Sequence, residues 1–152
     1  MRAAISPGGM LGVVLLASGL SAVAAAQPEP VWERDLAAAI DQLGDFGYDV
    51  RSRASSLIRR APEDQARPTL AAAVSGHADG YVRFRALVLL VGFGGAEARQ
   101  AVLAALADPN DRLRAVAYGY FEHSPDPAAA GQFLAALETE TSEFVRPALI
   151  RT

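Results

Sequence analysis

An apolar residue followed by arginine recurs along this chain at an almost constant interval, and no other feature constrains the fold as strongly. The pairs are Val50-Arg51, Val82-Arg83, Leu113-Arg114 and Val145-Arg146, separated by 32, 31 and 32 residues. Alanine follows three residues after the first three arginines, as Ala54, Ala86 and Ala117. A period of about 20–50 residues is typical of solenoids, in which each repeat packs on its neighbours.

A second motif lies between these pairs, so each repeat is predicted to contain two helices. It is written TLAAAVSG (69–76), VLAALADP (102–109) and FLAALETE (133–140). In the first helix of the third repeat, Leu113, Val116, Ala117, Tyr120 and Phe121 have the spacing of an amphipathic helix. No segment sustains the alternation typical of a strand. The pattern predicts an all-α solenoid of antiparallel helix pairs.

The chain divides into three parts on this pattern. Residues 1–26 form an expected signal peptide, and residues 27–47 supply an N-terminal capping helix. Residues 48–152 form the repeat domain, with units at about 48–78, 79–110 and 111–142. A fourth unit, 143–152, is incomplete on this division, which suggests a fragment of a longer protein.

The first 26 residues have the three parts of a secretory signal. Arg2 is their only charge, an apolar run follows from Met10, and the run ends in small residues at Ala26. The alternative is an uncleaved membrane anchor, but the run is shorter than the ~20 residues of a spanning helix. We therefore expect a periplasmic or secreted protein without stable membrane insertion after cleavage.

The segments DGYVRFRALVLLVGFGGAEARQAVLAALADPND and DRLRAVAYGYFEHSPDPAAAGQFLAALETETSE resemble HEAT repeats, in particular the short type first named from phycobilin lyases. The resemblance covers about residues 45–152. It implies a right-handed superhelix, with the first helix of each pair on the convex side and the second on the concave side. It also implies binding of a partner protein. The lyase activity of some relatives does not carry over, because the matching residues are scaffold positions.

Residues able to carry chemistry are few. His77 and His123 are far apart, no cysteine is present, and no metal-ligand spacing occurs, so no catalytic, cofactor or metal residue is assigned. Beyond residue 26, 13 arginines face 17 acidic residues, and this acidic balance argues against nucleic-acid binding.

The recurring arginines have two interpretations. Arg51, Arg83, Arg114 and Arg146 form either an anion-binding stripe or, as we expect, a structural column bonded to acids or loop carbonyls of adjoining units. The expected acidic partners are Asp79, Asp108 and Asp111. Tyr118, beside the apolar stripe of its helix, is a candidate for a partly exposed interface residue.

These observations favour an exported, non-catalytic scaffold that binds a protein partner. The alternative is an accessory repeat domain of a larger exported enzyme whose catalytic part lies beyond residue 152. An enzyme within these residues is disfavoured, because no polar groups converge.

Signal cleavage gives the first prediction. Expression in an exporting host should yield a mature chain that begins at Gln27, as N-terminal sequencing will show. An intact Met1 on a membrane-bound product would contradict it.

Overall fold

Eight α-helices and one short 3-10 helix make up the part of the chain that the computed structural model describes, residues 31–152. They are α1 (Val31–Gln42), α2 (Tyr48–Arg60), α3 (Glu63–Gly76), α4 (Gly80–Phe93), α5 (Gly95–Ala105), α6 (Asp111–His123), η1 (Pro127–Ala129), α7 (Ala130–Thr139) and α8 (Arg146–Arg151). No strand occurs among these residues, so the all-α prediction is confirmed. The expected signal peptide lies outside the described residues.

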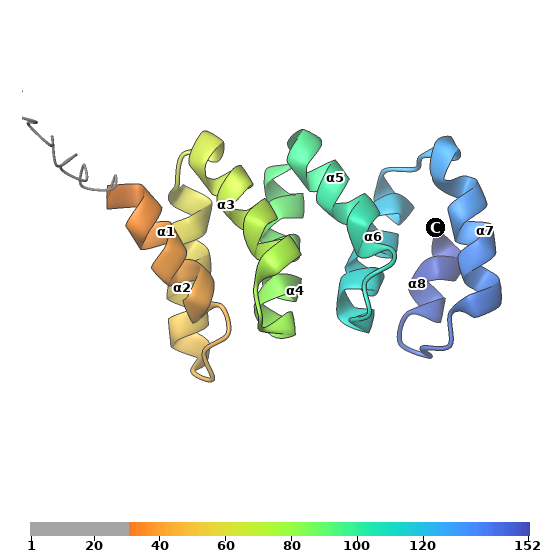
Figure 1. The fold of residues 1–152 in the computed structure, drawn as a ribbon, viewed down its shortest axis with the longest axis horizontal. Coiled ribbons are helices and arrows are strands. Elements are labelled where there is room, and N and C mark those ends of the chain that lie inside the picture. The colour runs from red at the N-terminus through yellow and green to blue at the C-terminus, as the bar shows by residue number, and fades with distance from the viewer. Residues whose placement is uncertain (1–30) are drawn as a thin grey trace, which may run out of the picture.

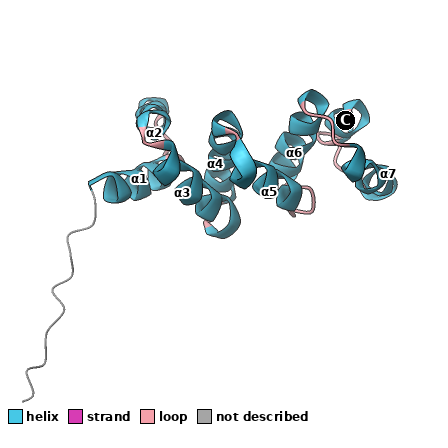
Figure 2. Ribbon diagram, turned by 90° about the horizontal axis from the view of Figure 1, so that it is seen from above, coloured by secondary structure: helices cyan, strands magenta, loops and turns pink. Residues whose placement is uncertain are grey.

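Successive helices run in opposite directions and stack into an elongated solenoid (Figure 1). Seen from above, the helices form two layers (Figure 2). We call α1, α3, α5 and α7 the second-helix layer, and α2, α4, α6 and α8 the first-helix layer. Helix α3 packs on α1, α4 and α5, and α6 packs on α4, α5 and α8. Each of the inner helices α3 to α6 thus contacts neighbours in both layers, as in a repeat array.

Both layers contribute to one main hydrophobic core, and a smaller cluster lies between α6 and α8. Leu43, Ile58, Leu70, Leu87 and Leu90 are fully buried in the main core. The repeated alanines of the first helices, Ala54, Ala86 and Ala117, are buried at equivalent positions. Small side chains at these points let neighbouring helices approach closely, because interaxial distance depends on the side chains at the contact.

Two glycines allow the tight connections between these helices. Gly94 has φ of 68°, which an L side chain rarely adopts, and it alone separates α4 from α5. Gly44 lies in the loop after α1, where an added Cβ would meet Val82 Cγ2 at 2.8 Å. A larger residue at Gly44 would push this loop away from α4.

Equivalent leucines of the second helices become exposed along the array. Leu70 of α3 is fully buried and Leu103 of α5 is half-buried, but Leu134 of α7 is 67% exposed. No side chain of α7 is buried, whereas five side chains of α4 are. Since neighbouring repeats supply most solenoid stability, α7 is the weakly held end of the described chain.

Hydrogen exchange should reflect this gradient. We expect the amides of α7 to exchange faster than those of Ala86–Leu90 in α4, measured by mass spectrometry on the intact chain. Equal protection of the two helices would contradict the conclusion that α7, with its exposed Leu134, is weakly packed.

Candidate functional site

The recurring arginines are bonded to the loops that enter the first helices. Arg51 donates through Nη1 to the carbonyls of Asp45 and Phe46, at 2.7 and 2.8 Å. Arg146 donates to the carbonyl of Glu140 at 2.9 Å. Both arginines therefore bind the loop that precedes their own helix.

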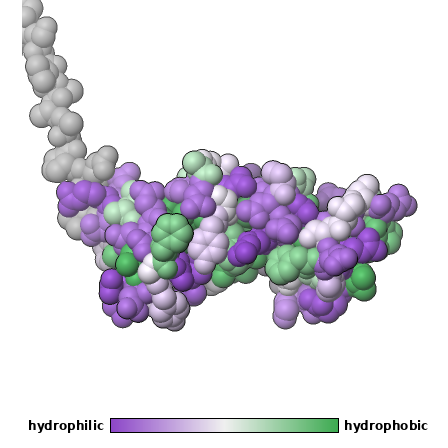
Figure 3. All heavy atoms as spheres, turned by 90° about the horizontal axis from the view of Figure 1, so that it is seen from below, coloured by the Kyte–Doolittle hydropathy of each residue, from purple (hydrophilic) through white to green (hydrophobic). Residues whose placement is uncertain are grey.

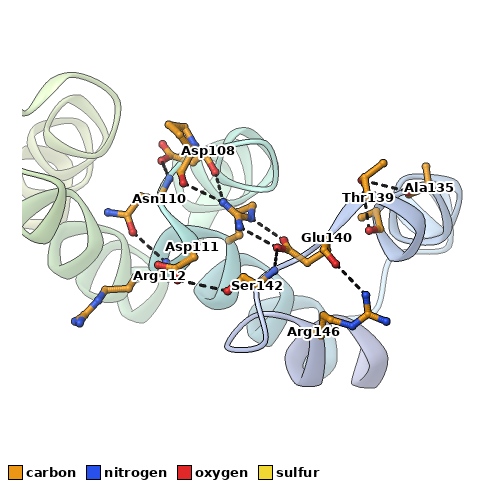
Figure 4. Close-up of polar contacts among 12 residues, drawn as sticks. Asp108, Asn110, Asp111, Arg112, Ala135, Thr139, Glu140, Ser142 and Arg146 are labelled. Atoms are coloured by element: carbon orange, nitrogen blue, oxygen red, sulfur yellow. Dashed lines mark hydrogen bonds and ion pairs between the residues drawn. The ribbon is translucent and has the colours of Figure 1, made fainter.

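The other two arginines reach forward to the next loop. Arg83 Nη2 lies 3.1 Å from Asp108 Oδ1. Arg114 binds both carboxylate oxygens of Glu140, through Nε at 2.7 Å and Nη2 at 2.9 Å (Figure 4). Arg114 also donates to the carbonyls of Asp108 and Pro109. A guanidinium suits this position because its planar fork donates in several directions at once.

Glu140 is buried, and burial raises the pKa of a carboxyl. The hydrogen bonds from Arg114 outweigh that effect and hold the pKa of Glu140 below its ordinary value. They also raise the pKa of Arg114. The pair is therefore charged at neutral pH and is satisfied by hydrogen bonds.

The four loops share one further hydrogen bond. The residue six positions before each recurring arginine accepts, through its side chain, the amide N–H two positions later. The acceptor and donor residues are Asp45 with Gly47, His77 with Asp79, Asp108 with Asn110, and Glu140 with Ser142. The same loop conformation thus repeats along one edge of the solenoid.

The expected acidic partners fit only in part. Asp108 pairs with Arg83 as expected, but Asp79 forms no ion pair with a recurring arginine and accepts the N–H of Tyr81, so it caps α4. Asp111 forms no ion pair among residues 31–152 and accepts the hydroxyl of Ser142. Glu140 was missed. The signal was its position, since an acid stands six residues before three of the four arginines.

The expectation that Tyr118 is partly exposed is wrong. Tyr118 is 2% exposed, because it packs against Val145 and Leu149 and meets the ring edge of Phe133. Burial also raises its pKa. The most exposed aromatic residues are instead Phe46 and Tyr48, at the loop edge after α1.

The edge of the solenoid that carries the loops before the first helices is mainly polar, apart from these two rings and the exposed Phe144. Figure 3 views it from below and shows hydrophilic side chains over most of the surface, with separate apolar patches.

The two histidines form only local contacts. His77 Nε2 lies 3.2 Å from Asp41, and His123 Nδ1 contacts the carbonyl of Gly119. Among residues 31–152, no three His, Asp or Glu side chains are grouped to hold a metal ion. Nor is any helix in this range long and apolar enough to cross a membrane.

Two adjacent grooves lie in the second-helix layer. One, of about 520 Å³ between α3 and α5, has Ala71, Val74, Ala101 and Ala104 in its wall and Glu97 at its edge. The other, of about 630 Å³ between α1 and α3, is lined by Leu36, Ala37 and Pro68, with Glu33 and Asp64. Ala72 lines both grooves, and no arginine lines either.

Charge is divided between the layers. The second-helix layer holds three arginines and seven acids, Glu33, Asp35, Asp41, Glu63, Asp64, Glu97 and Glu138. Two of those arginines are paired, Arg67 with Glu63 and Arg99 with Asp126. The first-helix layer holds three acids and ten arginines, Arg51, Arg53, Arg59, Arg60, Arg83, Arg85, Arg112, Arg114, Arg146 and Arg151.

The paired antiparallel helices and their repeating loops define an all-α repeat solenoid. A family model of HEAT repeats matches residues 36–120, more than half of the chain, which therefore belongs to the HEAT repeat family. HEAT repeats commonly act as scaffolds for protein interaction and are typically non-catalytic. Neither curated proteins nor solved structures give a match to the chain.

The pair of Arg114 and Glu140 gives a stability prediction. Arg114→Ala should lower the free energy of unfolding by about 2–3 kcal/mol at pH 7, because a buried carboxylate loses its charged donors. Denaturant unfolding measures this. As a control, Arg53→Ala removes an exposed arginine of α2 that forms no ion pair within residues 31–152, and it should change stability little.

The same variant should respond to acid in a defined direction. Because the pKa of Glu140 is lowered in the folded state, the pair stabilises the fold above pH 4.5 and loses this effect as pH falls further. The difference between Arg114→Ala and the parent should therefore shrink below pH 4.5. A constant difference would contradict the ion pair.

Proposed function

We propose that this chain is an exported, non-catalytic HEAT scaffold whose second-helix layer binds a basic amphipathic segment of a partner protein. The observation that carries this proposal is the pair of adjacent grooves with alanine-rich walls and acidic edges. Export is supported by the charged start, apolar run and small-residue end of residues 1–26. The site of action is then the periplasm or the extracellular space.

The shape of the grooves favours a helix or an extended segment over a small molecule. Both grooves are open, one between α3 and α5 and the other between α1 and α3, and small side chains such as Ala72 and Ala104 leave room for apolar residues of a partner. An amphipathic helix that places its apolar face in such a groove is a common mode of peptide recognition.

Charge specifies the other face of the bound segment. Glu33, Asp64 and Glu97 are exposed at the groove edges, and none of them forms an ion pair within residues 31–152. A segment with lysine or arginine beside its apolar stripe would meet these carboxylates. Complementary charges of this kind guide association and orient the partner more than they increase affinity.

A designed peptide tests this proposal. The probe is a fluorescein-labelled, helix-forming peptide with leucines on one face and lysines on the other, followed by fluorescence anisotropy. We expect saturable binding that weakens as salt is raised, because the edge charges are screened. The double variant Asp64→Asn/Glu97→Gln should weaken binding by about tenfold, which corresponds to about 1.4 kcal/mol.

The matched control is Asp49→Asn. Asp49 occupies the first turn of α2, as Asp64 and Glu97 occupy the first turns of α3 and α5, so a similar helix-dipole interaction is lost in the other layer. Asp49→Asn should leave binding unchanged. An equal loss in both variants, or no saturable binding by the parent, would refute the groove as the docking site.

A further inference from the structure

Half of the ten arginines in the first-helix layer form neither an ion pair nor a hydrogen bond to a loop carbonyl within residues 31–152. Arg83, Arg114 and Arg151 form ion pairs, and Arg51 and Arg146 bind loop carbonyls. The remaining five form no ion pair within residues 31–152, and they are Arg53, Arg59, Arg60, Arg85 and Arg112. These arginines give the first-helix layer a net positive charge, whereas the second-helix layer is acidic.

Two of the five, Arg59 and Arg85, line one small cleft between α2 and α4. The cleft measures about 110 Å³ and is lined by Ser55, Arg59, Phe84, Arg85, Val88 and Leu89. Val88 lines the cleft and is 42% exposed, whereas the adjacent Leu87 and Leu89 of α4 are buried. The Arg59 guanidinium lies beside Gly92 of α4, so it reaches across from α2.

Aromatic rings hold the guanidinium groups of Arg85 and Arg112 in place. Arg85 Nη1 donates to the hydroxyl of Tyr81 at 3.0 Å. Arg112 of α6 lies 5.9 Å from the ring centroids of both Tyr81 and Phe84. Contact with aromatic rings orders an arginine side chain while its charge stays available to a ligand. Arg59, Arg85 and Arg112 thus form one surface across three successive first helices, which we call the arginine surface.

We propose that the arginine surface binds an acidic protein segment that inserts one apolar side chain into the cleft. Guanidinium groups bind carboxylates in a bidentate manner, and the cleft has an apolar lining in Phe84, Val88 and Leu89. The surface is separate from the grooves of the second-helix layer, so this proposal goes beyond the function proposed above.

The charge of the whole molecule favours a short segment over an extended polyanion. The net charge is −3, so a nucleic acid or an anionic membrane would meet repulsion from the acidic layer. A short acidic segment senses only the local charge, since screening limits the interaction to about 8–10 Å at physiological salt.

Anisotropy with a fluorescein-labelled peptide tests the proposal on the full chain. The probe contains aspartate and glutamate around a central leucine, and a second probe has serine in place of that leucine. We expect saturable binding of the leucine probe, weaker binding of the serine probe, and a decrease in both with salt. Arg59→Gln/Arg112→Gln should reduce affinity by about tenfold or more.

Arg34→Gln serves as the control, because Arg34 is an exposed arginine of α1 in the opposite layer and forms no ion pair within residues 31–152. It should leave binding unchanged, and thermal unfolding will show that all variants are folded. Absence of saturable binding, an equal loss in Arg34→Gln, or equal affinity for both probes would overturn the proposal. Tighter binding to duplex DNA or to phosphatidylglycerol vesicles would also overturn it. Because the two proposals use different layers and opposite charges, failure of one leaves the other unaffected.

Discussion

The spacing of the first helices depends on a hydrogen-bonded loop that recurs four times. In each loop a side chain accepts an amide two residues later, and at three of them an arginine donates to the loop carbonyls. Arg83 and Arg114 then connect the first helix of their own unit to the loop that leads into the next first helix. Loop conformation and unit spacing are thereby coupled, as the nearest-neighbour stability of a solenoid requires.

The coupling is not uniform. At the junction after α3, His77 stands where Asp108 and Glu140 stand in the later loops. Its Nδ1 accepts an amide, and its Nε2 faces Asp41 rather than Arg51. No arginine ion pair spans that junction in the described chain, and the apolar packing of Leu70 and Val82 holds it instead. The two layers therefore combine a hydrogen-bonded polar edge with faces of opposite charge, and both proposed docking surfaces lie on those faces.

The periodicity of the sequence predicted the helices and their pairing because each repeat buries equivalent residues against its neighbours. Ala54, Ala86 and Ala117 mark those positions directly. The sequence did not reveal which acid meets which arginine, because that depends on how far each side chain reaches across a loop. Tyr118 shows a second limit. Its position beside the apolar stripe suggested exposure, whereas packing of α8 on α6 covers it.

The division of charge between layers could have been read from the sequence, given the helix pairing, since most arginines lie in the first helix of each pair. The cleft beside Arg59 could not have been predicted from the sequence. It depends on the separation of α2 from α4 and on the rotamers of Phe84 and Arg85, which no pattern of residue types encodes.

A double-mutant cycle on Arg114 and Glu140 tests most directly whether the loops couple neighbouring units. The free energies of unfolding of Arg114→Ala, Glu140→Ala, the double variant and the parent give the interaction energy of the pair. The account predicts a favourable coupling of about 1–3 kcal/mol at pH 7, since two charge-assisted hydrogen bonds join the two side chains. Additive effects of the two substitutions would show that the pair does not connect the units and would contradict the account.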